Sequence, residues 1–249
     1  MITIHLYALS PFNEKIVRTL HYKGINNYRM IEYPLGDRRV KKISPTGKLP
    51  CIEFNGQFIQ DSTDIVYFLE REFPEHSVLP AKPEQQALVH ILEDWADESL
   101  YFYEMHMRFG LPHNGKKNIP RMLVNSTGFM HWFLSKVLPS GILKITESQG
   151  IGRKHIEQLI IDVRRHLDAV DKLLQNNQWL VANQFSLADM AVCAMFDCLK
   201  DAEEVAEMLS AYPKITDWMK RVQALTDQPV IRIEDRKVSQ LVDAEARPA

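Results

Sequence analysis

Cysteine is scarce in this chain of 249 residues, which contains only Cys51, Cys193 and Cys198. An odd number of cysteines without a C-x-x-C pair excludes a disulfide-rich secreted scaffold and a zinc knuckle, and it favours a reducing compartment. The nine histidines are scattered, and none forms the H-E-x-x-H spacing of a zinc-binding helix. We therefore expect no metal cofactor.

Long apolar runs are also missing from the sequence. No window approaches the ~18 apolar residues that a membrane-spanning helix needs. Residues 1–6 lack both the basic start and the unbroken apolar stretch of a secretory signal. We therefore expect a soluble protein of the cytoplasm with no membrane partner.

Neither sign of charge dominates, because 30 Lys and Arg residues stand against 32 Asp and Glu residues and give a formal net charge of -2. A dedicated nucleic-acid-binding protein normally carries a strongly basic face, so we expect no nucleic-acid partner. The one basic cluster lies in residues 38–48, where a solvated loop is the simpler interpretation. With 45% hydrophobic residues, the chain has the composition of a globular protein.

The amino-terminal part alternates between strand-like and helix-like patterns. Apolar side chains with period two at residues 2–7, and a second segment at 28–33, predict strands. Between them, Ser10 and Pro11 predict the start of a helix, because serine is a good N-cap and proline suits the first helical position. Gly24 is expected to end that helix.

A β-hairpin and a further helix follow. Asn55 and Gly56 separate two short strand-like segments, 50–54 and 57–60, and this dipeptide is the strongest short-range hairpin signal. Asp61 then opens a helix. The predicted order is β-α-β, then a hairpin, then α.

The carboxyl-terminal part shows helical periods and no strand signal. Apolar side chains at i, i+3, i+4 and i+7 predict helices at 88–95 and 156–170. Ser186 and Asp189 have nearly the spacing and chemistry of a capping box at the start of an apolar helix.

The two patterns divide the chain into four parts. Within the helical part we also expect loops at 110–120 and 138–152. The predicted parts are an α/β domain at 1–76, a proline-rich linker at 77–85, an all-helical domain at 86–230 and a loosely held tail at 231–249.

Three segments together resemble the cytosolic glutathione transferases. Residues 10–15, Ser-Pro-Phe-Asn-Glu-Lys, are similar to the C-P-F motif of omega-class enzymes, with Ser in place of Cys. Residues 44–50, Ser-Pro-Thr-Gly-Lys-Leu-Pro, and the Asp-Ser pair at 61–62 resemble the N-P-x-G-x-V-P and E-S signatures of the family. Residues 186–189 match its S-x-A-D element. The resemblance implies the glutathione transferase fold, a thioredoxin-like α/β domain followed by an all-α domain.

A further segment widens the range of functions that the resemblance implies. Residues 149–153, Gln-Gly-Ile-Gly-Arg, are similar to bacterial glutathione transferases and to failed-axon and metaxin-like relatives. Some of those relatives have no established catalysis. A non-catalytic binding or scaffold protein therefore stays open as an alternative to an enzyme.

The resemblance implies that Ser10 is the catalytic residue and that glutathione is the co-substrate. Glutathione reacts as its thiolate, and a free thiol with a pKa near ~8.5 is mostly protonated at neutral pH. A hydroxyl donor and a helix N-terminus both stabilise the anion, and Ser10 offers both. The simpler interpretation of Ser10 is an ordinary N-cap. Tyr7 and Asn13 are reserve donors.

The serine changes the chemistry that the resemblance implies. A hydroxyl cannot form the mixed disulfides of the Cys-type relatives, so we expect glutathione to attack a small hydrophobic electrophile, or a peroxidase, dehalogenase or isomerase variant of that reaction. A glutathione-dependent peroxidase or reductase that uses Cys51 or Asn13 is a further alternative. Cys51 is otherwise expected to be a buried, inert strand residue.

The remaining glutathione contacts are implied residue by residue. A cis peptide between Leu49 and Pro50 would expose a strand edge to the cysteinyl backbone, although most X-Pro bonds are trans. Asp61 would meet the γ-glutamyl ammonium group, and Ser62, at a helix N-terminus, the adjacent carboxylate; their simpler role is to cap the helix. Lys48 is the expected partner of the glycyl carboxylate. Its substitutes are Arg38, Arg39 and Lys41.

The electrophile is expected between the two domains. Phe12 would contribute to both the glutathione site and this pocket, and Trp132 is a further candidate for its wall. The simpler interpretation of the helical stripe is core. The expected wall residues are Tyr7, Tyr101, Met105 and Phe109. Relatives of this kind are usually two-fold dimers, so the resemblance implies a homodimer.

Overall fold

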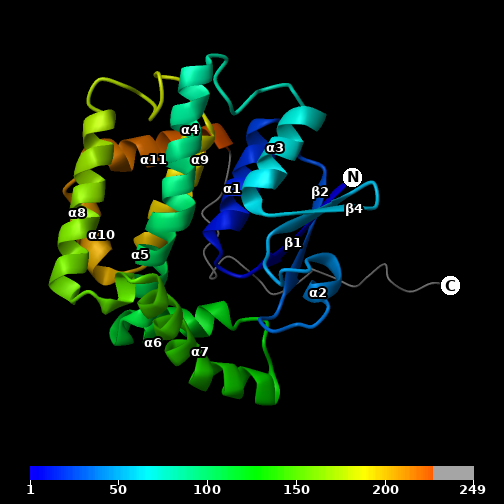
Figure 1. Cartoon of the computed structure of the whole chain (residues 1–249), viewed down its shortest axis with the longest axis vertical. Coiled ribbons are helices and arrows are strands. Elements are labelled where there is room, and N and C mark those ends of the chain that lie inside the picture. Colours follow the sequence, from blue (N-terminus) through cyan, green and yellow to red (C-terminus); the bar gives the residue numbers. More distant parts are fainter. Residues whose placement is uncertain (227–249) are drawn as a thin grey trace.

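A computed structural model of the chain describes residues 1–226 (Figure 1). The predicted tail at 231–249 and the last four residues of the predicted helical domain lie outside the described residues. The amino-terminal part contains β1 (Ile2–Tyr7), α1 (Pro11–Tyr22), β2 (Tyr28–Tyr33), α2 (Val40–Ile43), β3 (Cys51–Phe54), β4 (Gln57–Gln60) and α3 (Ser62–Glu72).

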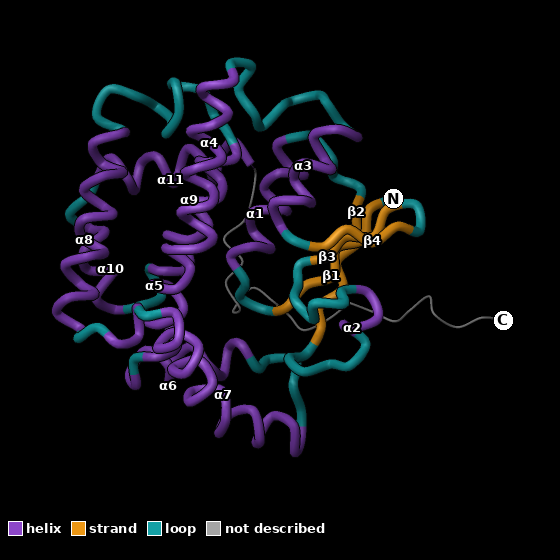
Figure 2. Tube along the Cα trace, viewed as in Figure 1, coloured by secondary structure: helices purple, strands orange, loops and turns teal. Residues whose placement is uncertain are grey.

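The rest of the described chain is helical, and Figure 2 shows all strands gathered on one side of the molecule. Three short segments, η1 (Ala96–Leu100), η2 (His106–Gly110) and η3 (Ile151–Arg153), adjoin the α-helices; the first two are π-helical and the third is a 3-10 turn. The α-helices are α4 (Pro83–Trp95), α5 (Tyr101–Met105), α6 (Pro112–Met122), α7 (Gly128–Gln149), α8 (Ile156–Leu173), α9 (Leu187–Leu199), α10 (Glu203–Ser210) and α11 (Pro213–Thr226).

The four strands form one mixed sheet in the order β2-β1-β3-β4. β1 pairs in parallel with β2 and antiparallel with β3, and β3 and β4 form the predicted hairpin. His5 lies opposite Cys51, and Cys51 lies opposite Gln60. The end of β1, the start of β3 and the end of β4 therefore meet at one end of the sheet. α1 and α3 begin at this same end.

The two faces of the sheet are covered by different elements. On one face, Ile4 and Ile52 join the main apolar core with Leu20 of α1 and Leu69 of α3. On the other face, Val40 of α2 joins a smaller cluster. We expected a loop where α2 forms; its single buried apolar residue is too weak a periodic signal to predict four helical residues.

Helix α9 lies at the centre of the helical part and packs against both α1 and α4. Every residue from Leu187 to Phe196 is buried. Asp189 closes the predicted capping box, because its carboxylate accepts hydrogen bonds from the backbone N–H groups of Ser186 (3.0 Å) and Leu180 (2.9 Å). The indole N–H of Trp218 donates to the same carboxylate at 2.8 Å.

Two predicted loops are wrong. Residues 110–120 lie largely in α6, and 138–152 lie largely in α7, which continues through Pro139. Proline and glycine in these segments suggest breaks, but buried Ile119 and Ile142 join a common apolar cluster, and this packing outweighs the weak local propensity.

The predicted linker also ends early, because α4 begins at Pro83 as its first helical residue.

In the described part of the chain, no helix combines the length and the apolar character that crossing a membrane would require.

Candidate active site

Ser10 occupies the N-cap position of α1. Its φ of -82° and ψ of 126° are extended, and Pro11 takes the first helical position, as the sequence predicts. The Ser10 side chain makes no hydrogen bond to the helix N–H groups, while its carbonyl accepts from the Asn13 N–H at 3.2 Å. Ser10 is a half-buried residue whose hydroxyl is not used in capping, and it lies beside the positive end of the helix.

The loop before Ser10 is tied down from two directions. The Asn13 side-chain amide donates to the Tyr7 carbonyl at 2.5 Å, which engages one of its two N–H bonds. Arg108, from η2, donates to the Leu9 carbonyl at 3.1 Å. Leu9 has a φ of 62°, a left-handed conformation that a non-glycine residue rarely adopts without support.

Tyr7, the other reserve donor, packs against the apolar cluster around Leu49 and Cys51 on the α2 face of the sheet. Burial raises the pKa of its hydroxyl above the ordinary value. The structure therefore gives Tyr7 an apolar packing role, and it brings Tyr7 close to the predicted glutathione contact at Leu49.

The Leu49–Pro50 peptide is cis, and both residues are buried. The preceding loop is held to the end of β4, because Ser44 Oγ lies 2.6 Å from the Lys48 carbonyl oxygen and 2.9 Å from Gln60 Oε1. This arrangement fixes the backbone that leads into β3 at the same end of the sheet as Ser10.

The candidate cations for the glycyl carboxylate lie on the surface. Lys48, Arg38 and Lys41 are all exposed. Arg39 is also exposed but forms an ion pair with Asp37 at 2.7 Å, and this hydrogen bonding lowers the pKa of the Asp37 carboxyl. Of these four cations, Lys48 is the nearest in sequence to the cis peptide.

Asp61 and Ser62 start α3 as predicted. The Asp61 carboxylate accepts a hydrogen bond from the Thr63 N–H at 2.9 Å and is otherwise exposed. Ser62 is the first helical residue and is buried. Asp61 therefore caps α3 with its carboxylate and also presents an accessible negative charge.

A buried charge cluster lies behind these two helix starts, and sequence reasoning missed it. Lys15 Nζ donates to Glu93 Oε1 at 2.7 Å and also to Asp97. The Thr63 hydroxyl donates to the same Glu93 oxygen at 2.5 Å. Burial raises the pKa of Asp97 to about 7. The cluster joins α1, α3 and the α4–η1 segment; the only sequence signal was a lysine among the buried positions of α1.

The structure brings together only part of the predicted electrophile wall. The rings of Phe12 and Tyr101 are in contact across the two parts of the chain, with centroids 4.9 Å apart. Met105 is half-buried against a cluster in which Phe109 is 4% exposed. Phe109 is therefore core, for which its position on an apolar helical stripe is the ordinary explanation.

Trp132 lies apart from these residues. It is on α7, 57% exposed, and its ring neighbour is Phe129, at a centroid distance of 5.7 Å. Neither the Phe12 nor the Tyr101 ring is among its ring contacts.

All three cysteine thiols are buried. Burial raises the pKa of Cys51 to about 11, and it raises the pKa values of Cys193 and Cys198 well above the ordinary value. The thiolate is the reactive form of cysteine. This environment opposes the redox alternative in which Cys51 is the reactive residue. In residues 1–226, no three His, Cys, Asp or Glu side chains form a group that could hold a metal ion.

Comparison with known proteins gives relatives that cover up to four fifths of the chain. The chain is 26% identical over 207 residues to Protein LigF of Sphingobium sp. (strain NBRC 103272 / SYK-6), which covers 80% of this chain and 79% of LigF. It is also 26% identical over 112 residues to glutathione S-transferase L3 of Arabidopsis thaliana, covering 43% of this chain and 45% of the relative.

Solved structures share the fold. A glutathione S-transferase from Rhodospirillum rubrum F11 has a TM-score of 0.66 at 21% identity, over 93% of this chain and 90% of that one. FzlA from C. crescentus also has a TM-score of 0.66, at 18% identity, over 94% and 92% of the two chains. The β-etherase LigF from Sphingobium sp. strain SYK-6 has a TM-score of 0.62 at 19% identity, over 92% and 96%.

Two family models cover most of the chain between them. Residues 28–118 match the glutathione S-transferase N-terminal domain. Residues 135–225 match the glutathione S-transferase C-terminal domain. These matches agree with the four-stranded mixed sheet followed by helices. The chain belongs to the glutathione S-transferase family.

Proposed function

We propose that this protein is a glutathione S-transferase in which Ser10 stabilises the glutathione thiolate for attack on a small hydrophobic electrophile. Membership of the family supports a glutathione-transferase-type function. The observation that carries the proposal is the Ser10 hydroxyl, which lies at the N-terminus of α1 without capping that helix. It lies at the end of the sheet where the cis peptide and the start of α3 also meet.

Each part of glutathione has a partner in the proposal. The cysteinyl backbone pairs with the strand edge next to the Leu49–Pro50 cis peptide. The exposed Asp61 carboxylate attracts the γ-glutamyl ammonium group, and Ser62 meets the adjacent carboxylate at the N-terminus of α3. Lys48 supplies the positive charge for the glycyl carboxylate.

The chemical step follows from the thiolate. On binding, the thiol proton leaves to solvent, while the Ser10 hydroxyl and the α1 N-terminus stabilise the negative sulfur. The sulfur lone pair forms a bond to the electrophilic carbon. In a displacement, the leaving group departs with the electrons of its bond to that carbon, so the overall reaction consumes no oxidant.

The pair of rings formed by Phe12 and Tyr101 is the part of the predicted pocket that the proposal retains. Their apolar faces favour an aromatic or aliphatic electrophile. The likeness to LigF, a β-etherase, makes aryl ethers one class to include when electrophiles are screened.

We also propose that the protein is a homodimer, as family members usually are, and that it acts in the cytoplasm. Sedimentation analysis tests the homodimer.

Calorimetric titration with reduced glutathione in two buffers of different ionisation enthalpy tests the proposal. Binding should release a proton, because the site favours the thiolate, and ultraviolet absorption of the thiolate should appear at neutral pH. A wild-type protein that does not bind millimolar glutathione would show that the fold serves a binding or scaffold role instead. Binding without proton release would remove thiolate stabilisation from the proposal.

A further inference from the structure

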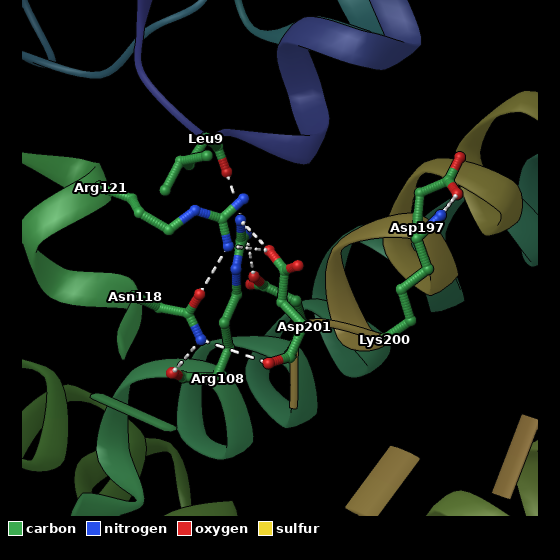
Figure 3. A network of polar contacts seen from close by, with 8 residues as sticks. Leu9, Arg108, Asn118, Arg121, Asp197, Lys200 and Asp201 are labelled. Carbon is green, nitrogen blue, oxygen red and sulfur yellow. Dashed lines mark hydrogen bonds and ion pairs between the residues drawn. The ribbon is translucent and has the colours of Figure 1, made fainter. Parts of the chain in front are cut away.

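Arg108 is a buried cation that links the helical part of the chain to the loop before Ser10 (Figure 3). Its side chain is 2% exposed. Nη1 lies 2.7 Å from Glu104 Oε1, one turn earlier in the same helical segment, and Nη2 lies 2.8 Å from Asp201 Oδ2. Nη1 also donates to the Leu9 carbonyl at 3.1 Å.

The contact with Leu9 is not needed to balance the charge of Arg108. Glu104 and Asp201 already supply two carboxylates, and Arg121 adds a second cation at 2.9 Å from Asp201. Figure 3 shows Arg121 and Arg108 approaching Asp201 from different sides, with the Leu9 carbonyl pointing at the Arg108 guanidinium. The hydrogen bond to the Leu9 carbonyl therefore acts on the loop before Ser10 and not on the charge balance of Arg108.

This hydrogen bond holds Leu9, the residue immediately before Ser10. Leu9 has a φ of 62°, which a leucine adopts only when its surroundings hold it there. On its other side the loop is tied by Asn13, which donates to the Tyr7 carbonyl. Asn13 belongs to α1 itself, whereas Arg108 comes from a segment nearly a hundred residues later. Leu9 is thus the point where the helical domain fixes the backbone that leads to Ser10.

We propose that Arg108 is a positioning residue for the transferase reaction: it holds the Leu9 carbonyl, and through it the orientation of the Ser10 hydroxyl toward the glutathione sulfur. This inference rests on the proposed function. Arginine suits the task because its planar group presents several donors at fixed angles and keeps its charge at all relevant pH values. A lysine ammonium has neither the planar geometry nor the reach to hold all three acceptors.

The test compares Arg108→Lys with Arg121→Gln. The first variant keeps a positive charge near Glu104 and Asp201 but loses the planar group that reaches Leu9. The second removes a hydrogen bond to the same Asp201 without touching the loop. Both are measured for melting temperature, for kcat and the KM of glutathione, and for the pH profile of kcat/KM.

We expect Arg108→Lys to lower kcat by about tenfold to a hundredfold, because a displacement of around 1 Å in a reacting group has effects of this size. The KM of glutathione should change by less than about threefold, since the binding groups are untouched. The apparent pKa of the bound thiol should rise toward that of free glutathione. Arg121→Gln should keep wild-type kinetics and pH profile even if its melting temperature falls.

Equal kinetics and pH profiles for Arg108→Lys and Arg121→Gln would overturn the inference while leaving the proposed function intact. A wild-type protein without glutathione binding or turnover would overturn both. If Arg108→Lys does not fold, Asp201→Asn replaces it. Asp201 is 24% exposed, and its substitution weakens the ion pair at Nη2 of the Arg108 guanidinium, the nitrogen that does not contact Leu9. A fall in kcat for Asp201→Asn beyond that of Arg121→Gln supports the inference, and no difference between them overturns it.

Discussion

At the scale of single residues, the sequence motifs predicted the local backbone around the candidate site residues but not the buried charges that pack behind them. Ser10, Pro50 and Asp61 each lie in a short motif that can be read from neighbours in sequence: a serine before a proline, a loop motif that resembles the family's, and an Asp-Ser pair at a helix start. Lys15 and Arg108 have no such signature. Their partners lie up to 99 residues away, and only the folded chain brings them together.

The first prediction concerns the Ser10 hydroxyl. Ser10→Ala should lower kcat for conjugation more than about tenfold, since it removes a hydrogen bond that strengthens as the sulfur becomes negative. Glutathione affinity should stay within a few fold, and Ser10→Thr, which retains a hydroxyl, should recover part of the rate. Steady-state kinetics with calorimetric dissociation constants measure both effects. Equal rates for wild type and Ser10→Ala would rule out Ser10 as the activating residue.

The second prediction concerns the charge of Asp61. Asp61→Asn should weaken glutathione binding by about tenfold, because the ammonium group loses its counter-charge, a change of about 1.4 kcal/mol. Asparagine is as good an N-cap as aspartate, so the melting temperature should hardly change. Asp64→Asn, an exposed residue of the same first turn, is the control. An unchanged dissociation constant for Asp61→Asn would exclude the γ-glutamyl assignment.

At the scale of elements, the helix starts and the hairpin were predictable, and the long helices were not fully so. Asn55 and Gly56 take positive φ angles of 50° and 78°, as a tight hairpin turn requires, and any chain with this dipeptide signals it locally. α7 runs through Pro139 because buried side chains such as Ile142 hold it against its neighbours. A sequence pattern shows the proline but not the neighbours.

The third prediction concerns the cluster that joins α1, α3 and η1. The pKa of Asp97 is raised to about 7, chiefly by burial, from an ordinary value of 3.8. Between these values the folded state keeps a proton that the unfolded chain releases, so this contribution to stability is full at low pH and is lost as pH rises through about 7.

Asp97→Asn removes this titration. The stability of wild type minus that of the variant should therefore fall by on the order of 2 kcal/mol between acidic pH and pH 8. Urea unfolding at several pH values measures the difference. Asp94→Asn, on the exposed face of α4, is the control for the loss of a surface carboxylate. A flat difference for Asp97→Asn would show that Asp97 ionises normally in the folded state.

At the scale of the whole molecule, the sequence predicts two kinds of structure in order, and the described residues show how firmly they join. One apolar cluster includes Ile4 and Leu20 of the α/β part together with Val163 and Ala191 of the helical part. Ion pairs between Arg18 and Asp197, and between Lys15 and Glu93, cross the same boundary. Composition and periodicity separate the two parts well but contain no information on the contacts between them.

The fourth prediction follows from this shared core. The α/β and helical parts should unfold in one transition, because separating them would expose apolar surface and leave buried charges without partners. Hydrogen–deuterium exchange of β1 peptides and of α9 peptides across a urea series should give the same midpoint. Two midpoints would show that the parts unfold independently, with the boundary contacts contributing little.

The burial of Cys51, Cys193 and Cys198 has a practical consequence for the bench. The native protein should present no sulfhydryl group to a chromogenic disulfide reagent, so that reagent would count glutathione alone and follow its consumption directly. For the same reason, a cysteine introduced at the exposed Ser140 would be the one accessible thiol among residues 1–226, so a fluorophore could be attached there without replacing any native cysteine.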